Sequence, residues 1–120
     1  MTLYTYAARC ARVVDGDTIR ALFQLGFHVS LEQTVRLLGI DAPETNSPDA
    51  TARLAAQMAK VRLGQLLPPD LTVIVQTHKT RETDRYGRYL ADILLPDGRY
   101  VAQVLLAEGL VRAYAGGARS

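Results

Sequence analysis

The sequence predicts an α+β domain: five strands that form a small barrel, a helix between the third and fourth strands, and a short helix after the fifth. Segments rich in β-branched or alternating apolar residues are separated by turn residues. One longer segment, residues 47–66, has a helix-start signal and is followed by two prolines. Neither a repeat nor a linker interrupts the 120 residues, so we expect a single domain over residues 1–120.

The composition is that of a globular protein. Apolar residues make up 48% of the chain and charged residues 22%, so disorder is not expected. The formal net charge of +2 is only mildly basic. A protein that held nucleic acid by charge alone would carry a denser Lys/Arg surface, so the composition argues against that class.

The sequence also carries signals about the compartment. Cys10 is the only cysteine, so no intrachain disulfide forms, and a buried inert thiol is expected. The amino terminus lacks a basic start followed by a long apolar run, which a signal peptide requires. No apolar run approaches the roughly 20 residues that span a bilayer. We therefore expect a cytoplasmic protein with no membrane partner, or a secreted or periplasmic one if a leader has been removed.

The first third of the chain predicts three strands. Residues 6–14 are β-compatible, and residues 15–16 are typical of a turn. Strands follow over 17–25 and 27–40, with the polar residues 32–34 as either a bulge or an exposed stretch. The apolar positions that share a face are Ile19, Ala21, Phe23 and Leu25 in one strand and Val29, Leu31, Val35 and Leu37 in the next.

The segment Ser47-Pro48-Asp49 predicts a helix start, with Ser47 as the N-cap and Pro48 at the first helical position. The helix should run to about Leu66, because Pro68-Pro69 stops it. Three apolar residues fall on one helix face and two cations on the other: Leu54, Met58 and Val61, against Arg53 and Lys60.

In the rest of the chain we expect two strands, Leu71–Thr77 and Arg88–Leu95. A short helix, Val101–Glu108, should follow and be closed by Gly109, and Leu110–Tyr114 should be extended. Five strands with a helix between the third and the fourth is the order of an oligonucleotide-binding (OB) barrel. The expected fold is therefore a five-stranded OB-fold β-barrel.

Three short segments carry the residues suited to chemistry. They read DGDT at residues 15–18, RLLGIDAPET at 36–45 and DRYGR at 84–88. Together they supply carboxylates for a hard metal ion and arginines for a phosphate. A metal-dependent phosphodiesterase needs these groups.

The acidic half of the candidate site is Asp17, Asp41 and Glu44. Three carboxylates brought close together repel one another, so either a cation joins them or some stay protonated. Because the segments contain no His or Cys, the ligands would all be oxygen, which suits Ca²⁺ or Mg²⁺ rather than Zn²⁺. Taken singly, each residue has a plainer interpretation: Asp17 as part of a hairpin turn, Asp41 as part of a strand-ending turn, and Glu44 as a solvated charge.

The basic half is Arg36 and Arg88, since guanidinium groups stabilise the charge that a phosphodiester gains under attack. The alternative for Arg36 is a partly buried ion pair with Asp41, and the alternative for Arg88 is a surface charge at a strand start. Arg36 and Asp41 are an odd number of residues apart, so alternation along one strand would send them to opposite faces. For both to reach one site the strand must bulge or curl, and Gly39 is the expected place.

Through these three segments, in this order and rough spacing, the chain resembles the staphylococcal nuclease (thermonuclease) family. The resemblance covers residues 8–114, the expected core, with 115–120 as a flexible tail. It implies Asp17 and Asp41 as direct metal ligands and the carbonyl of Ala42 as a third. Ca²⁺ is the implied cofactor, with Mg²⁺ or Mn²⁺ as alternatives.

The resemblance also implies a reaction. A monomer would hydrolyse DNA, RNA or both at the 5′ P–O bond and leave 3′-phosphate ends. The implied roles are catalytic for Arg36, Glu44 and Arg88, and substrate-binding for Arg85, Tyr86 and Tyr114. The chain departs from the best-known member at Ala42, where that protein has Thr, and in a longer connection over residues 25–33.

Two other functions stay open. One is a nucleic-acid-binding or scaffold domain that keeps the barrel without the chemistry, and the other is an OB domain that binds nucleotides or oligosaccharides. Because the acidic and arginine positions that match the family are all present, the sequence favours the enzyme. Metal-dependent release of acid-soluble nucleotides from single-stranded DNA would distinguish it from both.

Overall fold

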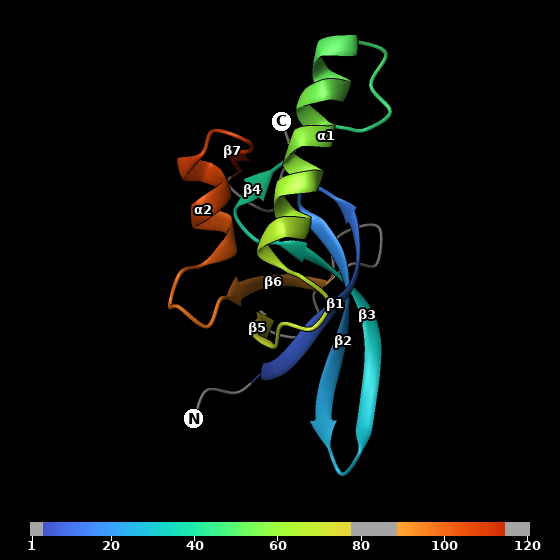
Figure 1. The fold of residues 1–120 in the computed structure, drawn as a ribbon, viewed down its shortest axis with the longest axis vertical. Coiled ribbons are helices and arrows are strands. Elements are labelled where there is room, and N and C mark those ends of the chain that lie inside the picture. The colour runs from blue at the N-terminus through green and yellow to red at the C-terminus, as the bar shows by residue number, and fades with distance from the viewer. Residues whose placement is uncertain (1–3, 78–88, 115–120) are drawn as a thin grey trace.

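The computed structural model describes residues 4–77 and 89–114 (Figure 1). In chain order its elements are β1 (Thr5–Asp15), β2 (Thr18–Gly26), β3 (Val29–Leu37), β4 (Ile40–Asp41), α1 (Ala50–Leu66), β5 (Val73–Thr77), β6 (Tyr89–Leu94), α2 (Val101–Ala107) and β7 (Arg112–Ala113).

Five of these strands close into a barrel in the order β1-β2-β3-β6-β5, with β1 also paired to β5. The β3–β6 pair is parallel and the other barrel pairs are antiparallel. Along the chain, helix α1 comes between the third and fourth barrel strands (β3 and β5), and α2 follows the fifth (β6). The predicted α+β barrel is therefore confirmed. A separate two-stranded sheet, β4–β7, was not predicted as a pair.

Alternating side chains of the barrel strands fill its interior. Fully buried positions include Ile19, Val35, Leu37, Val75 and Ile93. Cys10 is buried too, and burial raises the pKa of its thiol, as expected for an inert cysteine.

Helix α1 begins two residues later than the sequence predicted. Its N-cap is Asp49, whose carboxylate accepts a hydrogen bond from the amide of Thr51 at 3.1 Å. The prediction that Ser47 is the N-cap is wrong. Its hydroxyl accepts a hydrogen bond from the Asp49 amide at 3.2 Å and so orders the turn before the helix. The helix ends at Leu66, as predicted. Within the described residues, neither helix has the length and hydropathy of a membrane span.

The apolar stripe predicted on α1 faces solvent instead of the core. Leu54, Met58 and Val61 are exposed, and the buried residues of the helix are Ala56, Ala59, Leu63 and Leu66. The helix packs closely on the turn before β2: a Cβ added to Gly16 would lie 2.7 Å from the Cβ of Ala59. Gly16 and Ala59 permit this approach because both are small, and this contact helps to select the buried face of the helix. The first turns of α1 extend past the barrel (Figure 1).

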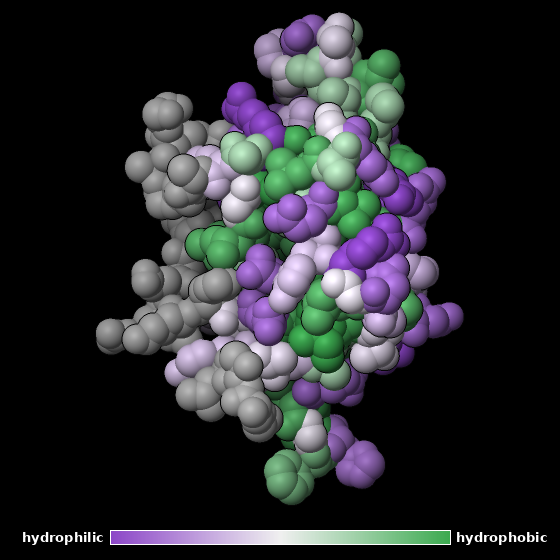
Figure 2. Space-filling model, turned by 90° about the vertical axis from the view of Figure 1, so that its left-hand side faces the viewer, coloured by the Kyte–Doolittle hydropathy of each residue, from purple (hydrophilic) through white to green (hydrophobic). Residues whose placement is uncertain are grey.

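The β2–β3 hairpin extends past the barrel in the opposite direction (Figure 1). Its turn residues, Phe27 and His28, have φ angles of 55° and 63°. The polar stretch 32–34 continues the regular pairing with β2, so it is not a bulge. Apolar side chains gather at the projecting end, the lower end of Figure 2, and four of them are exposed: Leu25, Phe27, Val29 and Leu31. The predicted apolar face is therefore buried only in the barrel half of the hairpin.

Candidate active site

Two of the three candidate carboxylates meet at Arg36. Asp17 precedes β2, Arg36 lies near the end of β3, and Asp41 ends β4. The Nη2 atom of Arg36 is 3.0 Å from Oδ1 of Asp41 and 3.4 Å from Oδ2 of Asp17. All three residues are buried. We refer to Asp17, Arg36 and Asp41 as the charged cluster.

A turn at Gly39 brings Arg36 and Asp41 together despite their odd spacing. Strand β3 ends at Leu37, Gly39 has a φ of 83°, and β4 begins at Ile40. This left-handed conformation favours glycine. The predicted change of direction at Gly39 is confirmed, although it ends one strand and starts another rather than bulging a single strand.

Asp17 is held by hydrogen bonds to both carboxylate oxygens. The hydroxyl of Thr18 donates to Oδ1 at 2.8 Å, and the amide of Ala42 donates to Oδ2 at 3.1 Å. Ala42 thus reaches the cluster, through its N–H group. Its proposed carbonyl ligation stays a prediction. Thr18 belongs to the DGDT segment, but the sequence did not reveal that its hydroxyl would hold Asp17.

Strand β7 (Arg112–Ala113) and the residue that follows it bring two further side chains to the cluster. The ring of Tyr114 lies 5.2 Å from the Cζ atom of Arg36, within cation–π range. Nη2 of Arg112 lies 3.5 Å from Oδ2 of Asp41. Tyr114 was predicted at the site and is found beside it. Arg112 was missed, although its spacing of two from Tyr114 places both on one face of an extended segment.

Glu44 lies in the segment that follows β4 and is exposed. The neighbouring Thr45 hydroxyl donates to the Asp15 carboxylate at 3.3 Å, which ties this segment to the β1–β2 turn. Over residues 4–77 and 89–114, no three His, Cys, Asp or Glu side chains are grouped so that they could hold one metal ion. The structure thus joins Asp17 to Asp41 and leaves Glu44 on the adjacent segment.

The third sequence segment falls outside the described residues. Arg88, the second candidate catalytic arginine, lies in residues 78–88, together with Arg85 and Tyr86. Their roles stay predictions.

Comparison with known proteins settles the family. Residues 34–119 match the family model described as Staphylococcal nuclease homologue. The chain belongs to the staphylococcal nuclease homologue family. Asp41 and Glu44 fall within the matched residues, and Asp17 precedes them.

Two proteins of Bacillus subtilis (strain 168) are similar to this family member. Endonuclease YncB is 34% identical over 101 residues, which cover 84% of this chain and 44% of YncB. SPbeta prophage-derived endonuclease YokF is 36% identical over 101 residues, 84% of this chain and 32% of YokF. The chain therefore spans less than half the length of either relative.

The donors of the charged cluster fit a hard divalent cation. Two buried carboxylates, Asp17 and Asp41, share the one buried guanidinium of Arg36, and Arg112, which lies 3.5 Å from Asp41, is mostly exposed. A buried excess charge is costly unless something balances it. Carboxylate oxygens are the ligands that Ca²⁺ and Mg²⁺ prefer. In this staphylococcal nuclease homologue, Asp17 and Asp41 are thus the described residues best suited to hold such an ion.

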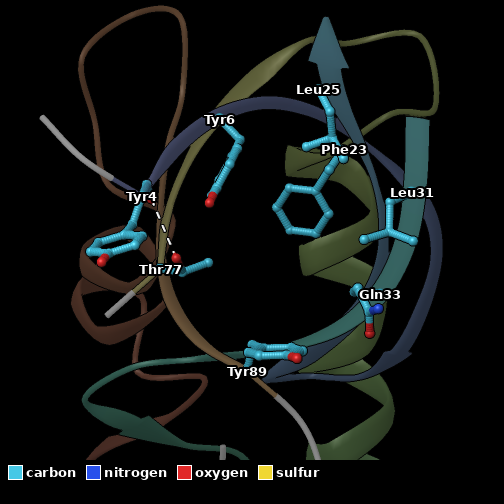
Figure 3. A pocket seen from close by; sticks show the side chains of 8 residues that line it. All are labelled: Tyr4, Tyr6, Phe23, Leu25, Leu31, Gln33, Thr77 and Tyr89. Carbon is cyan, nitrogen blue, oxygen red and sulfur yellow. Dashed lines mark hydrogen bonds between the residues drawn. The ribbon is translucent and has the colours of Figure 1, made fainter. Parts of the chain in front are cut away.

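A second feature of this family member, a pocket at the open end of the barrel, is chemically different (Figure 3). Its volume is about 300 Å³, and the described residues that line it are Tyr4, Tyr6, Phe23, Leu25, Leu31, Gln33, Thr77 and Tyr89. This lining contains no carboxylate, and it includes none of the candidate site residues. Phe23 meets Tyr6 edge to face, with ring centroids 5.6 Å apart. The candidate active site is therefore the charged cluster rather than this pocket.

Proposed function

We propose that this chain is a metal-dependent nuclease that hydrolyses phosphodiester bonds in DNA, RNA or both. The charged cluster is the observation that carries this proposal, because it buries two carboxylates around one arginine. Such an arrangement is costly for folding and suits a site that takes up a cation. The names of the relatives YncB and YokF, both endonucleases, support cleavage within a strand.

Asp17 and Asp41 would hold the cation, Ca²⁺ in this proposal, with Mg²⁺ or Mn²⁺ as alternatives. The bound ion would act as a Lewis acid toward a phosphoryl oxygen. Hydrogen bonds from Thr18 and Ala42 fix the Asp17 carboxylate before the ion arrives. This preorganisation lowers the cost of binding.

The chemical step would depend on Glu44 and the two arginines. Glu44 would position or deprotonate the attacking water, a role suited to an exposed carboxylate beside the cluster. Arg36 and Arg88 would neutralise the charge that develops on the phosphoryl oxygens as the 5′ oxygen leaves. The products would carry 3′-phosphate ends. Tyr114, stacked on Arg36, would keep that guanidinium in place and border the substrate, with Arg85 and Tyr86 as further contacts.

The test is digestion of end-labelled single-stranded DNA and RNA in Ca²⁺, Mg²⁺ or Mn²⁺, with a chelator control. We expect cleavage that needs the ion and leaves 3′-phosphate ends. Glu44→Gln should lower the rate about 10²–10⁴-fold, because it removes the carboxylate that positions or deprotonates the attacking water. Arg88→Ala should lower it about 10²–10³-fold, with little loss of fold.

Arg99→Ala is the matched control, since Arg99 pairs with Asp97 in the turn before α2 and its loss changes the net charge equally. It should cleave at the wild-type rate. Binding of DNA without cleavage in any of the three ions would replace the nuclease proposal with a nucleic-acid-binding domain. A Glu44→Gln or Arg88→Ala protein with near-native cleavage would remove that residue from the scheme.

A further inference from the structure

We propose that Arg112 is a further phosphate-binding residue of this site. In the protein alone its guanidinium rests against Asp41, and in the loaded enzyme it holds a backbone phosphate of the nucleic acid. The proposal rests on the proposed nuclease function. It adds a residue that lies on β7, outside all three sequence segments.

The pairing of β4 with β7 places Arg112 at the cluster. Asp41 and Arg112 are directly opposite each other in this antiparallel pair, so their side chains leave the sheet on the same face. The amide of Tyr114 donates to the carbonyl of Gly39 at 2.9 Å and extends the pairing. The position of Arg112 opposite Asp41 is thus fixed by the backbone pairing of β4 with β7.

Arg112 is held loosely compared with other arginines that form ion pairs. Arg20, Arg62 and Arg99 each have a carboxylate oxygen at 2.8 Å. Arg112 approaches Asp41 only to 3.5 Å, and 80% of its side chain is exposed. An arginine has five N–H donors, so most of this fork points to solvent beside the buried carboxylates. Such a guanidinium can take a phosphate without first breaking a strong ion pair.

The charge balance explains when Arg112 would change partner. Asp17, Asp41 and Arg36 together carry one negative charge, which the positive charge of Arg112 offsets. A divalent cation on the two carboxylates would reverse the sign of the cluster. The attraction that holds Arg112 near Asp41 would then be lost, and its fork would be available to an anion. Bidentate pairing with phosphate is the strongest use of that fork.

Tyr114 brings an aromatic ring to the same cluster as Arg112. It lies two residues after Arg112, and its ring covers Arg36. A cation that binds phosphate and an aromatic ring that can stack on a base are the usual parts of a single-strand groove. Arg112 would therefore contact a phosphate beside the one that is cleaved.

The experiment measures, by anisotropy in Ca²⁺, how tightly the Glu44→Gln protein binds a fluorescent single-stranded DNA octamer. This background is used because its slow cleavage should leave the octamer intact during the measurement. Adding Arg112→Ala should weaken binding about 10-fold, because a charge-assisted hydrogen bond is lost. The slope of log Kd against log salt should fall by about one phosphate contact. Arg112→Lys should bind with an intermediate affinity. Arg99→Ala should stay within about twofold of its parent.

A second readout, Mn²⁺ binding without DNA, separates this role from a structural one. If Arg112 only holds Asp41 in place, Arg112→Ala should weaken Mn²⁺ binding. Under our proposal Mn²⁺ affinity stays the same or rises, because a competing positive charge has gone. If the wild type cleaves DNA but Arg112→Ala does not change DNA affinity, the proposed role of Arg112 is overturned and the nuclease proposal stands. Failure of the wild type to bind or cleave DNA would overturn the nuclease proposal as well.

Discussion

The two ends of the β2–β3 ladder differ in which side chains they bury: one end buries charged residues, and the other exposes apolar ones. At one end Thr18 pairs with Arg36, and both are buried beside Asp17. At the other end Gly26 pairs with Val29, and the apolar Phe27 is 97% exposed. The same hairpin thus has charged side chains inside at one end and apolar side chains outside at the other.

Of the two ends, the charged one is the one that needs a functional explanation. Desolvating charged groups costs several kcal/mol per ion, so a buried charged cluster needs a reason other than stability. Exposed apolar side chains are common on folded proteins and need less explanation. We therefore place the proposed chemistry at the Asp17–Arg36 end and not at the Phe27 end.

Replacing Arg36 should have the largest effect. Arg36→Leu removes the guanidinium that Asp17 and Asp41 share. We therefore expect the free energy of unfolding, measured by urea denaturation, to fall by about 3–5 kcal/mol. Adding Ca²⁺ should recover part of that loss, because the ion replaces the missing charge. A loss below about 1 kcal/mol would mean that the charged cluster is solvated, and the contrast between the two ends would disappear.

Gly16→Ala tests the packing that positions the charged end. Its new Cβ would lie 2.7 Å from the Cβ of Ala59 and 3.1 Å from that of Ala42. Overpacking of this kind costs about 1–3 kcal/mol, which thermal or urea denaturation would measure. Ala59→Gly in the same protein should recover part of the loss, since it removes the closer contact. If the double variant is no more stable than Gly16→Ala alone, the contact with Ala59 is not the cause.

Changing the turn at the other end should increase stability. Phe27 and His28 both have positive φ angles, which suit Asn and Gly in a two-residue hairpin turn. Phe27→Asn combined with His28→Gly should raise the free energy of unfolding by about 1 kcal/mol and leave cleavage unchanged. Lower stability would show instead that the Phe27 side chain is buried in solution, for instance between two copies of the chain.

The smallest effect should come from the middle of the ladder. Arg20 and Glu32 form a partly exposed ion pair at 2.8 Å. Glu32→Gln should cost only about 0.2–1 kcal/mol, and added salt should reduce the difference from wild type. A loss as large as that for Arg36→Leu would contradict the view that burial makes the charged cluster special.

The barrel itself could be predicted because strands, turns and the helix each leave a local pattern. The face of α1 could not be predicted in this way. Its apolar stripe, which includes Leu54 and Met58, suggested the core, but the helix packs on Gly16 through the face that carries Ala59, where a large residue would not fit. Which helix face packs depends on the partner surface, and no local pattern reports that.

The residues of the charged cluster could be predicted, because residue types that suit a metal ion or a phosphate can be recognised in the sequence. Asp17, Arg36 and Asp41 were named, and the need for a turn at Gly39 followed from the spacing. Arg112 was missed, because its position depends on the two-residue pairing of β4 with β7 between distant parts of the chain. Pairs that short leave no periodic signal in the sequence.

A crystal structure of the wild-type protein grown with Ca²⁺ would test the proposed metal site most directly. We predict an anomalous peak about 2.3–2.6 Å from carboxylate oxygens of both Asp17 and Asp41, with Arg112 moved away from Asp41. No peak at that position, with Arg36 still bridging the two carboxylates, would contradict the claim that the charged cluster is a metal site.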